Sequence, residues 1–290
     1  MNKRFLFAFT ILCSANLWAD LPLSLEELYT DKGKFKLEAN LTYANSEQQN
    51  NSVSQPVYIE TTNHSLVAIP TVFSQTNSNN DMLLGNLGLR YGLTGKTDIY
   101  GNLSYLWNSE RNFDGLNSEK SNQNYLSDAT IGLSHTFWED GNNPALIGFI
   151  EGQAYDRVLN KSSSAKSWVI GATTYKAIDP VVLSLTASLG ANFKRKTAMG
   201  DYKAGNYFML NPSVSFAAND RVSFTGGVQW INSLPERLND SKLSSRNTST
   251  YAKFGIGFGV NDKTAINASA RFKLSGNSRA ELNLGLVYSF

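Results

Sequence analysis

Few residues of this chain could do catalytic chemistry. The sequence contains two histidines, and one of them, His135, directly follows Ser134. A serine hydrolase needs its serine and histidine side chains within hydrogen-bond distance of each other. Both residues lie in a segment of alternating polarity, and neighbouring residues of a strand point to opposite faces. The second histidine, His64, lies in a long polar segment. We therefore predict no catalytic site and no enzymatic activity.

The sequence also offers little that could hold a metal or a cofactor. Its single cysteine, Cys13, lies in an apolar N-terminal stretch, and two histidines without further thiols do not make a structural zinc site. No glycine-rich phosphate loop precedes a helix. The formal net charge of +2 falls to zero once the basic N-terminal residues Lys3 and Arg4 are set aside. We predict no metal, no cofactor and no nucleic-acid partner.

Charged side chains that alternate with apolar ones are the remaining functional candidates. In residues 34–43, lysines and a glutamate alternate with apolar residues. Side chains of a strand point alternately to its two faces, so one face here is apolar and the other polar. In later segments the same split gives apolar faces such as Leu87, Leu89, Leu183, Leu185, Phe254 and Ile256. The charges on the opposite faces, predicted to line a lumen, are Lys36, Glu38, Arg90, Asp98, Asp128, Glu151, Arg221, Lys253, Arg271, Lys273 and Glu281.

The N-terminus predicts export from the cytoplasm. After Lys3 and Arg4, residues 5–12 form an apolar run of the length of a signal peptide, and we predict cleavage after Ala19. The alternative, a lipoprotein with Cys13 as lipid acceptor, is weaker because residues 10–12 match a lipobox poorly.

The C-terminus indicates an outer-membrane destination. Residues 280–290 read AELNLGLVYSF and alternate between an apolar face and a face of small or polar residues. The segment resembles the C-terminal signal by which outer-membrane barrels are recognised for insertion. The residues that carry this membrane-insertion signal are Leu284, Leu286, Tyr288 and Phe290.

Hydropathy and turn spacing predict an all-β fold, a single antiparallel barrel. The mean hydropathy is −0.28. After the N-terminal stretch no apolar run approaches the ~18 residues of a helical span. A membrane protein of such weak hydropathy is typically a closed barrel. Short turns alternate with longer polar ones, such as the loop predicted over residues 109–124, as periplasmic turns and extracellular loops do. We count about twelve strands, which begin near residues 34, 83, 97, 125, 145, 166, 181, 205, 221, 248, 263 and 280. A soluble all-β periplasmic protein is the alternative.

The segment 46–82 interrupts this pattern. It is rich in Asn, Gln, Ser and Thr and contains one apolar patch, residues 66–73. Counting the patch as a barrel strand would give an odd number, which bacterial single-chain barrels avoid. We therefore predict a long extracellular loop over 46–82 that forms an outside hairpin or folds inward. Gly255, Gly257 and Gly259, on one inner face, would either leave space for a plug or ease curvature.

A short helix is predicted before the first strand. Ser24 and Glu27 form a capping box, Leu25, Leu28 and Tyr29 form an apolar edge, and Gly33 would end the helix. We therefore divide the chain into a signal peptide (1–19), a plug-helix segment that plugs or flanks the lumen (20–33) and a transmembrane barrel (34–290).

The run SLEELYTDKGKFKLEANLTY, residues 24–43, is similar to the helix and first strand of the outer-membrane secretion channel of Fap-type functional-amyloid systems. The runs LGLRYGLTGKTDIYGNLSYLW and LSDATIGLSHTFWEDGNNPALIGFIEG are similar to that family too, and to the broader group of barrels named for the MetA pathway of phenol degradation. The resemblance implies a twelve-stranded barrel that assembles as a homotrimer. It also implies a plug that contains Leu25, Glu27, Leu28 and Tyr29. That family has a periplasmic coiled coil before the plug, whereas the predicted mature chain begins almost at the plug.

Together these observations predict a channel in the outer membrane of a Gram-negative bacterium. The first hypothesis is export of a fibre-forming or surface protein, with gating by the N-terminal helix and inward charges that set selectivity. Two alternatives stay open: an uptake channel for small hydrophobic or aromatic compounds, and a non-conducting surface scaffold or adhesin. The predicted partners are outer-membrane lipid, the barrel-assembly machinery and a secreted fibre subunit.

Overall fold

The computed structural model describes residues 30–48, 57–62, 65–69, 77–114, 117–158, 161–275 and 279–290. Among these residues no helix is long and apolar enough to cross a membrane. The predicted signal peptide, its cleavage site at Ala19 and the predicted plug residues lie outside the described residues. The predicted plug helix therefore stays a prediction.

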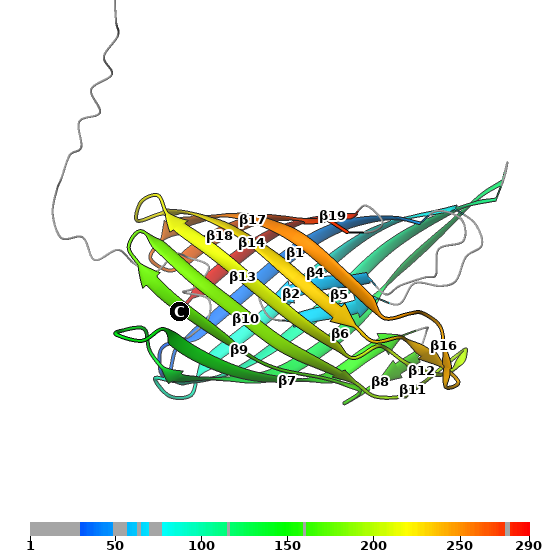
Figure 1. The fold of residues 1–290 in the computed structure, drawn as a ribbon, viewed down its shortest axis with the longest axis horizontal. Coiled ribbons are helices and arrows are strands. Elements are labelled where there is room, and N and C mark those ends of the chain that lie inside the picture. The colour runs from blue at the N-terminus through cyan, green and yellow to red at the C-terminus, as the bar shows by residue number, and fades with distance from the viewer. Residues whose placement is uncertain are drawn as a thin grey trace, which may run out of the picture.

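Twelve of the described strands form one closed antiparallel barrel (Figure 1). Each strand pairs with its neighbours in chain order, and β1 pairs with β19 to close the ring. The barrel strands are β1 (Phe35–Gln48), β4 (Asn77–Gly92), β5 (Thr97–Asp114), β6 (Asn117–Trp138), β7 (Ala145–Val158), β9 (Ser167–Ile178), β10 (Val181–Asn192), β13 (Tyr207–Ala217), β14 (Val222–Ser233), β17 (Asn247–Asn261), β18 (Thr264–Lys273) and β19 (Arg279–Ser289). All but β4 and β6 begin within two residues of the predicted positions.

The seam of the barrel joins the first and last strands. Their register runs from Lys36 opposite Ser289 to Ser46 opposite Arg279, and the Phe290 amide donates to the Phe35 carbonyl at 2.9 Å. A closed ring leaves no strand edge unpaired in the hydrocarbon, where an unpaired backbone group is costly. The predicted pairing of the closing strand with residues 34–43 is confirmed.

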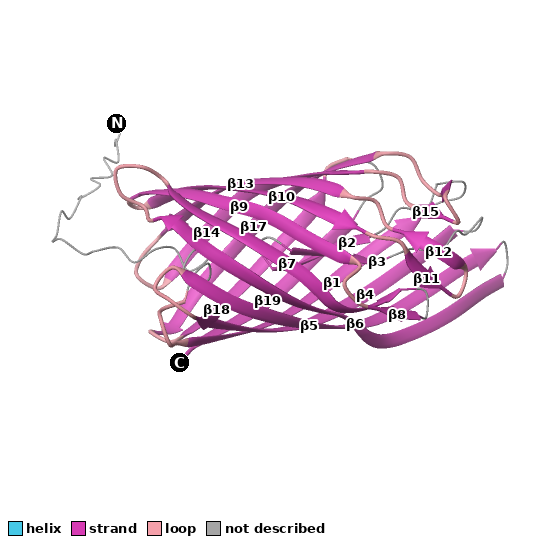
Figure 2. Ribbon diagram, turned by 90° about the horizontal axis from the view of Figure 1, so that it is seen from below, coloured by secondary structure: helices cyan, strands magenta, loops and turns pink. Residues whose placement is uncertain are grey.

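The two ends of the barrel differ in their connections. Short turns join β4 to β5, β9 to β10 and β17 to β18 at the end where the chain's C-terminus lies (Figure 2). The longer connections lie at the opposite end. Four short strands there form a separate sheet, the outer sheet: β11 (Arg195–Thr197), β12 (Gly200–Lys203), β15 (Arg237–Leu238) and β16 (Ser241–Lys242). Another short strand, β8 (Lys161–Ser163), pairs with the end of β7.

One predicted loop is regular strand. Residues 109–124 are polar and were expected to form a loop, but β5 and β6 stay paired out to Asp114 opposite Asn117. Beyond the membrane both faces of a hairpin meet water, so the alternation of polar and apolar side chains is lost. The two strands continue through backbone hydrogen bonds alone, and side-chain periodicity cannot predict such an extension.

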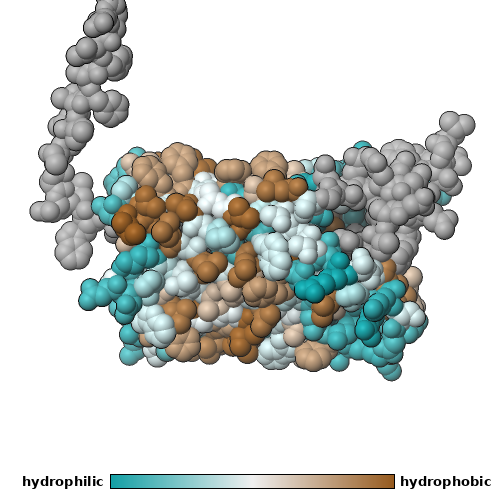
Figure 3. All heavy atoms as spheres, in the orientation of Figure 1, coloured by the Kyte–Doolittle hydropathy of each residue, from teal (hydrophilic) through white to brown (hydrophobic). Residues whose placement is uncertain are grey.

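The outer face of the barrel is apolar. Phe254 is 60% exposed, Leu284 59% and Leu87 56%, whereas polar residues that alternate with them, such as Asn86 at 3%, are buried on the inner side. In the space-filling view, hydrophobic side chains gather over the middle of the wall and hydrophilic ones over its ends (Figure 3). Such a large exposed apolar surface is rare on soluble monomers and suits a lipid-facing band.

The remaining two strands lie inside the barrel. β2 (Val57–Thr62) and β3 (Ser65–Ile69) pair with each other as an antiparallel hairpin, which we call the lumen hairpin. It appears in Figure 2 among the wall strands, and its side chains contact both halves of the wall. Over these residues the loop between β1 and β4 folds inward, which was one of the two predicted alternatives.

Candidate functional site

Apolar packing holds the lumen hairpin against two opposite parts of the wall. Its side chains enter two clusters of buried residues, one with β1, β4 and β5 and one with β7, β9, β13, β14 and β17. The first cluster comprises Val57, Ile59, Ile69, Ala44, Met82, Leu84 and Leu106. The second comprises Tyr58, Leu66, Phe149, Val169, Tyr207, Met209, Ile231 and Tyr251. Because the hairpin packs on both of its faces, it bridges the lumen.

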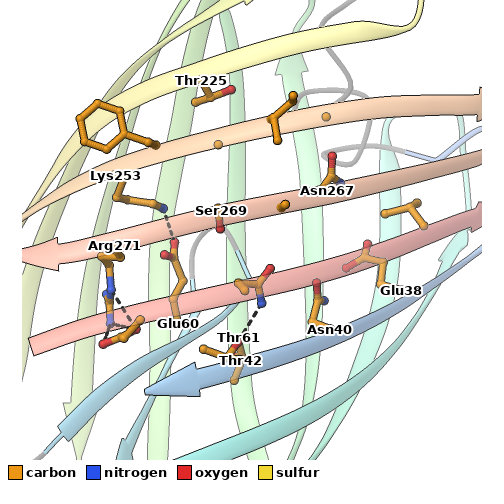
Figure 4. Close-up of a pocket in the computed structure, with 18 of the residues that line it drawn as sticks. Glu38, Asn40, Thr42, Glu60, Thr61, Thr225, Lys253, Asn267, Ser269 and Arg271 are labelled. Carbon is orange, nitrogen blue, oxygen red and sulfur yellow. Dashed lines mark hydrogen bonds and ion pairs between the residues drawn. The ribbon is translucent and has the colours of Figure 1, made fainter. Parts of the chain in front are cut away.

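Polar contacts fix the hairpin at both sides. From β18, Arg271 Nη2 donates to the Tyr58 carbonyl at 2.6 Å. From β17, Lys253 Nζ donates to Glu60 Oε1 at 2.8 Å (Figure 4). On the other side Ser65 Oγ donates to Oε1 of Glu151, on β7, at 2.5 Å. Each contact is made by a side chain, so the hairpin adds no strand to the wall.

The anchoring arginine belongs to a buried charge cluster. Arg271 and Glu281 are cross-strand partners with a nitrogen–oxygen distance of 2.6 Å, and Arg279 lies 3.0 Å from the same carboxylate. Arg271 also donates to Gln229 and stacks over the Tyr251 ring, 4.4 Å from its centroid. A buried charge is costly unless it is paired and hydrogen-bonded, and here the Glu281 carboxylate pairs with both arginines.

A second charge group lies nearer the short-turn end. Arg90, on β4, lies 3.8 Å from a Glu38 oxygen and 3.6 Å from an Asp98 oxygen. Its Nη1 donates to Ser134 Oγ at 3.2 Å. His135, the neighbour of Ser134, instead contacts Thr97 through Nδ1 at 2.9 Å. The serine and the histidine therefore have different partners and form no catalytic pair; His64 lies outside the described residues.

Cavities flank the hairpin. One, of about 170 Å³, lies between β2 and the wall formed by β1, β14, β17, β18 and β19 (Figure 4). It contains the predicted lumen residues Glu38, Arg90, Lys253, Arg271 and Glu281, and Gly255 and Gly257 form part of its surface. Another, of about 60 Å³, lies between β3 and strands β6, β7, β9 and β10, with Asp128 and Glu151 in its wall.

The other predicted lumen residues differ in burial. Lys36 and Asp98 are buried, with Asp98 3.6 Å from Arg90, and Lys273 is half-buried on β18. Arg221 is exposed in the turn between β13 and β14, because β14 begins one residue later than predicted. Sequence reasoning missed Tyr58, Glu60 and Ser65 as functional side chains. The β-branched and aromatic run at 57–59 signals a strand, but it does not say which wall residues the strand meets.

The outer sheet is tied to the barrel by buried charges. Arg195, on β11, forms an ion pair with Asp156 of β7 and donates to Ser167 Oγ at 2.9 Å. Tyr202 donates its hydroxyl hydrogen to Glu236 Oε1 at 2.6 Å. Burial raises the pKa of Glu236 to about 7.

Among the described residues no three His, Cys, Asp or Glu side chains gather as a metal site would need.

Comparisons with known proteins agree with this architecture. No protein-family model and no curated protein sequence matches the chain. Among solved structures, an outer-membrane channel from Pseudomonas putida F1 is similar with a TM-score of 0.61 and 12% identity, over 90% of this chain and 97% of that one. The translocator domain of the autotransporter NalP from Neisseria meningitidis has a TM-score of 0.55 and 10% identity, over 92% of each chain. The transport unit of the autotransporter AIDA-I from Escherichia coli has a TM-score of 0.51 and 11% identity, over 92% of this chain and 95% of that one.

The chain therefore has the fold of a bacterial outer-membrane β-barrel. Its closed ring of twelve described strands and its apolar outer face agree with a location in the outer membrane. The low identities make this a likeness of fold alone, and they leave the narrower resemblance to the amyloid secretion channel a prediction.

Proposed function

We propose that this protein is a gated outer-membrane channel in which the lumen hairpin is the gate, and that its solutes are small and polar. The observation that carries the proposal is the way the hairpin is held. It bridges the lumen through side-chain contacts alone, and cavities of about 170 and 60 Å³ lie on its two sides. Moving the hairpin would join these cavities without breaking any ladder of the wall.

Small polar solutes fit the lumen better than apolar ones. Most side chains around the larger cavity are charged, hydroxyl or amide groups, whereas the buried apolar side chains of the two clusters are occupied by packing against the hairpin. An apolar solute would have to displace the hairpin from its own clusters. For this reason we place uptake of hydrophobic or aromatic compounds second.

Export of a fibre-forming protein requires a larger change. An extended polypeptide would need the whole cross-section, and therefore complete withdrawal of the hairpin from both clusters. The export reading rests on the resemblance of residues 24–43, and so do the fibre subunit, the homotrimer and gating by residues 20–33. These stay predictions for this chain.

The test is a recording of ion conductance in planar bilayers with the full mature chain and a chain without the hairpin. Gln48 and Ser78 are register partners, so residues 49–77 can be replaced by an Asn-Gly turn that continues the β1–β4 ladder. The matched control replaces residues 110–121 in the same way, because Ser109 and Asn122 are partners in the exposed β5–β6 hairpin.

We expect several-fold higher conductance from the chain without the lumen hairpin and an unchanged conductance from the control. If removing the hairpin leaves the conductance of a conducting chain unchanged, the hairpin is not the gate. If none of the three chains conducts, the protein is a surface scaffold and not a channel. Swelling of vesicles in sugars and in short peptides then separates solute passage from polypeptide passage.

A further inference from the structure

The wall opposite β2 carries two adjacent rows of uncharged polar residues and glycines, which we call the polar belt. The cross-strand registers align one residue from each of β1, β19, β18, β17 and β14 in each row. The first row is Thr42, Asn283, Ser269, Gly255 and Thr225. The second row is Asn40, Gly285, Asn267, Gly257 and Ser223. Neighbouring strands lie about 4.8 Å apart, so the belt extends about 19 Å around the lumen.

The charges beside the belt are already neutralised. Lys253 is paired with Glu60 at 2.8 Å, Arg271 with Glu281 at 2.6 Å, and Arg90 lies 3.8 Å from Glu38. Three cations and three carboxylates thus border the cavity. Arg279 shares the Glu281 carboxylate at 3.0 Å, so an ionic solute would have to compete with these existing pairs in order to be held.

The belt itself has unused hydrogen-bonding capacity. Asn283 donates to Thr42 Oγ1 at 2.8 Å, which leaves other donor and acceptor sites of both side chains facing the cavity. Ser223 is 3% exposed, and its hydroxyl has no hydrogen-bond partner. A buried polar group without a partner is costly, and this hydroxyl could bind a solute only after the surrounding side chains move aside.

The glycines make room for a ring. A methyl group built on Gly255 would lie 3.6 Å or more from every neighbour, so the wall has ordinary space there. With no side chain at Gly255 and Gly257, a solute can approach the backbone between the hydroxyl and amide groups of the adjoining strands. Hydroxyls and amides both donate and accept hydrogen bonds. They can therefore bind sugar hydroxyls, which also act as both donors and acceptors.

We infer that the polar belt binds a neutral polyhydroxylated solute, a sugar or a polyol, on its way through the lumen. The inference rests on the proposed channel function and names the substrate class of that channel. The cavity beside the belt, of about 170 Å³, is bounded on its other side by Glu60 and Thr61 of the hairpin. Hairpin and belt therefore form the two sides of one binding site.

The test is calorimetric titration of the detergent-solubilised full chain with maltose, glucose, gluconate and glucosamine. In Gly255→Met the new side chain would occupy the space beside the belt where the solute is proposed to bind. Gly226→Met is the matched control, because Gly226 follows the register partner of Gly255, lies on the opposite face of β14 and has open space beside it. Asn283→Ala is a second belt variant that adds no bulk, and the gel mobility of the heated and unheated protein confirms folding of each variant.

We expect maltose or glucose to bind the wild-type chain and Gly226→Met equally. Gly255→Met should weaken this binding at least tenfold, Asn283→Ala several-fold, and gluconate and glucosamine should bind more weakly than the neutral sugars. Absence of sugar binding to the wild-type chain overturns the inference, as does tighter binding of a charged analogue. Equal binding by all folded variants also overturns it. The proposed channel stands in those cases if the chain without the hairpin conducts ions, and falls if it does not.

Discussion

The barrel wall and the lumen hairpin are both antiparallel β structure, yet different forces hold them. Each wall strand pairs along its length with neighbours on both sides, and the ring closes at β1 and β19. In the described residues the hairpin strands pair only with each other, and side chains attach them to the wall. Backbone groups in hydrocarbon must stay paired, whereas groups in a wet lumen can exchange partners with water. In the proposed function the wall is therefore the permanent part and the hairpin the part that moves.

The largest effect is expected from a substitution where the wall and the lumen hairpin meet. Glu281→Gln would leave Arg271 and Arg279 buried without their carboxylate, which costs about 3–5 kcal/mol for a buried pair. We expect lower barrel stability and a looser hairpin together, measured by chemical unfolding in detergent and by conductance. Leu282→Ala, on the lipid face of the same strand, is the control and should change neither the lumen charges nor the hairpin. An unchanged unfolding midpoint for Glu281→Gln would show that the cluster does not stabilise the wall.

A substitution in the apolar packing of the hairpin should have a smaller effect, and it should change the hairpin without changing the wall. Ile59 is fully buried in the cluster with Met82 and Leu84, and truncation of such a residue to alanine costs about 2–5 kcal/mol. Because Ile59 contributes to no wall ladder, Ile59→Ala should raise the open probability and leave barrel unfolding unchanged. Hydrogen exchange of residues 57–69 and single-channel recording measure the two parts. Equal losses in hairpin and wall would contradict the division between them.

The ion pair between Lys253 and Glu60 should contribute less. Both side chains are less than one-fifth exposed, and a hydrogen bond to a charged group contributes about 1.5–3 kcal/mol. Lys253→Met should increase hairpin opening less than Ile59→Ala does, and the exchange Lys253→Glu with Glu60→Lys should restore closure in part. Open probability in bilayers is the measurement. If the exchanged pair opens as readily as Lys253→Met alone, the contact does not act through its charges.

The smallest effect concerns the outer sheet, which is neither wall nor gate. Burial raises the pKa of Glu236 to about 7 from its ordinary value of 4.5, so the folded sheet holds a proton that the unfolded loop has lost. Stability of the sheet should therefore be fully present at low pH and fall as pH rises toward 7, by about fivefold in local opening between pH 6 and 7. Hydrogen exchange of residues 195–203 and 237–242 measures this opening. Glu236→Gln should abolish the slope, and a slope that persists in that variant would assign it to another group.

The barrel could be predicted from the sequence because lipid and lumen impose a simple rule. Leu87, Phe254 and Leu284 alternate with inward residues because hydrocarbon excludes charge from one face of every strand. Turn residues then mark the ends of the strands, so most strands begin within two residues of the predicted positions. In residues 109–124 both faces meet water and the rule does not apply, so the outer ends of β5 and β6 were missed.

The position of the lumen hairpin and the polar belt were decided only by the tertiary structure. The run at 57–59 favours a strand, but alternation cannot state that Tyr58 reaches Arg271, more than two hundred residues away in the chain. Thr42, Asn283, Ser269, Gly255 and Thr225 come from five strands, and only the register between those strands brings them into one row. Alternation is a local property that sequence carries by itself. Register and inward folding depend on contacts between distant segments, which exist only after the ring has closed.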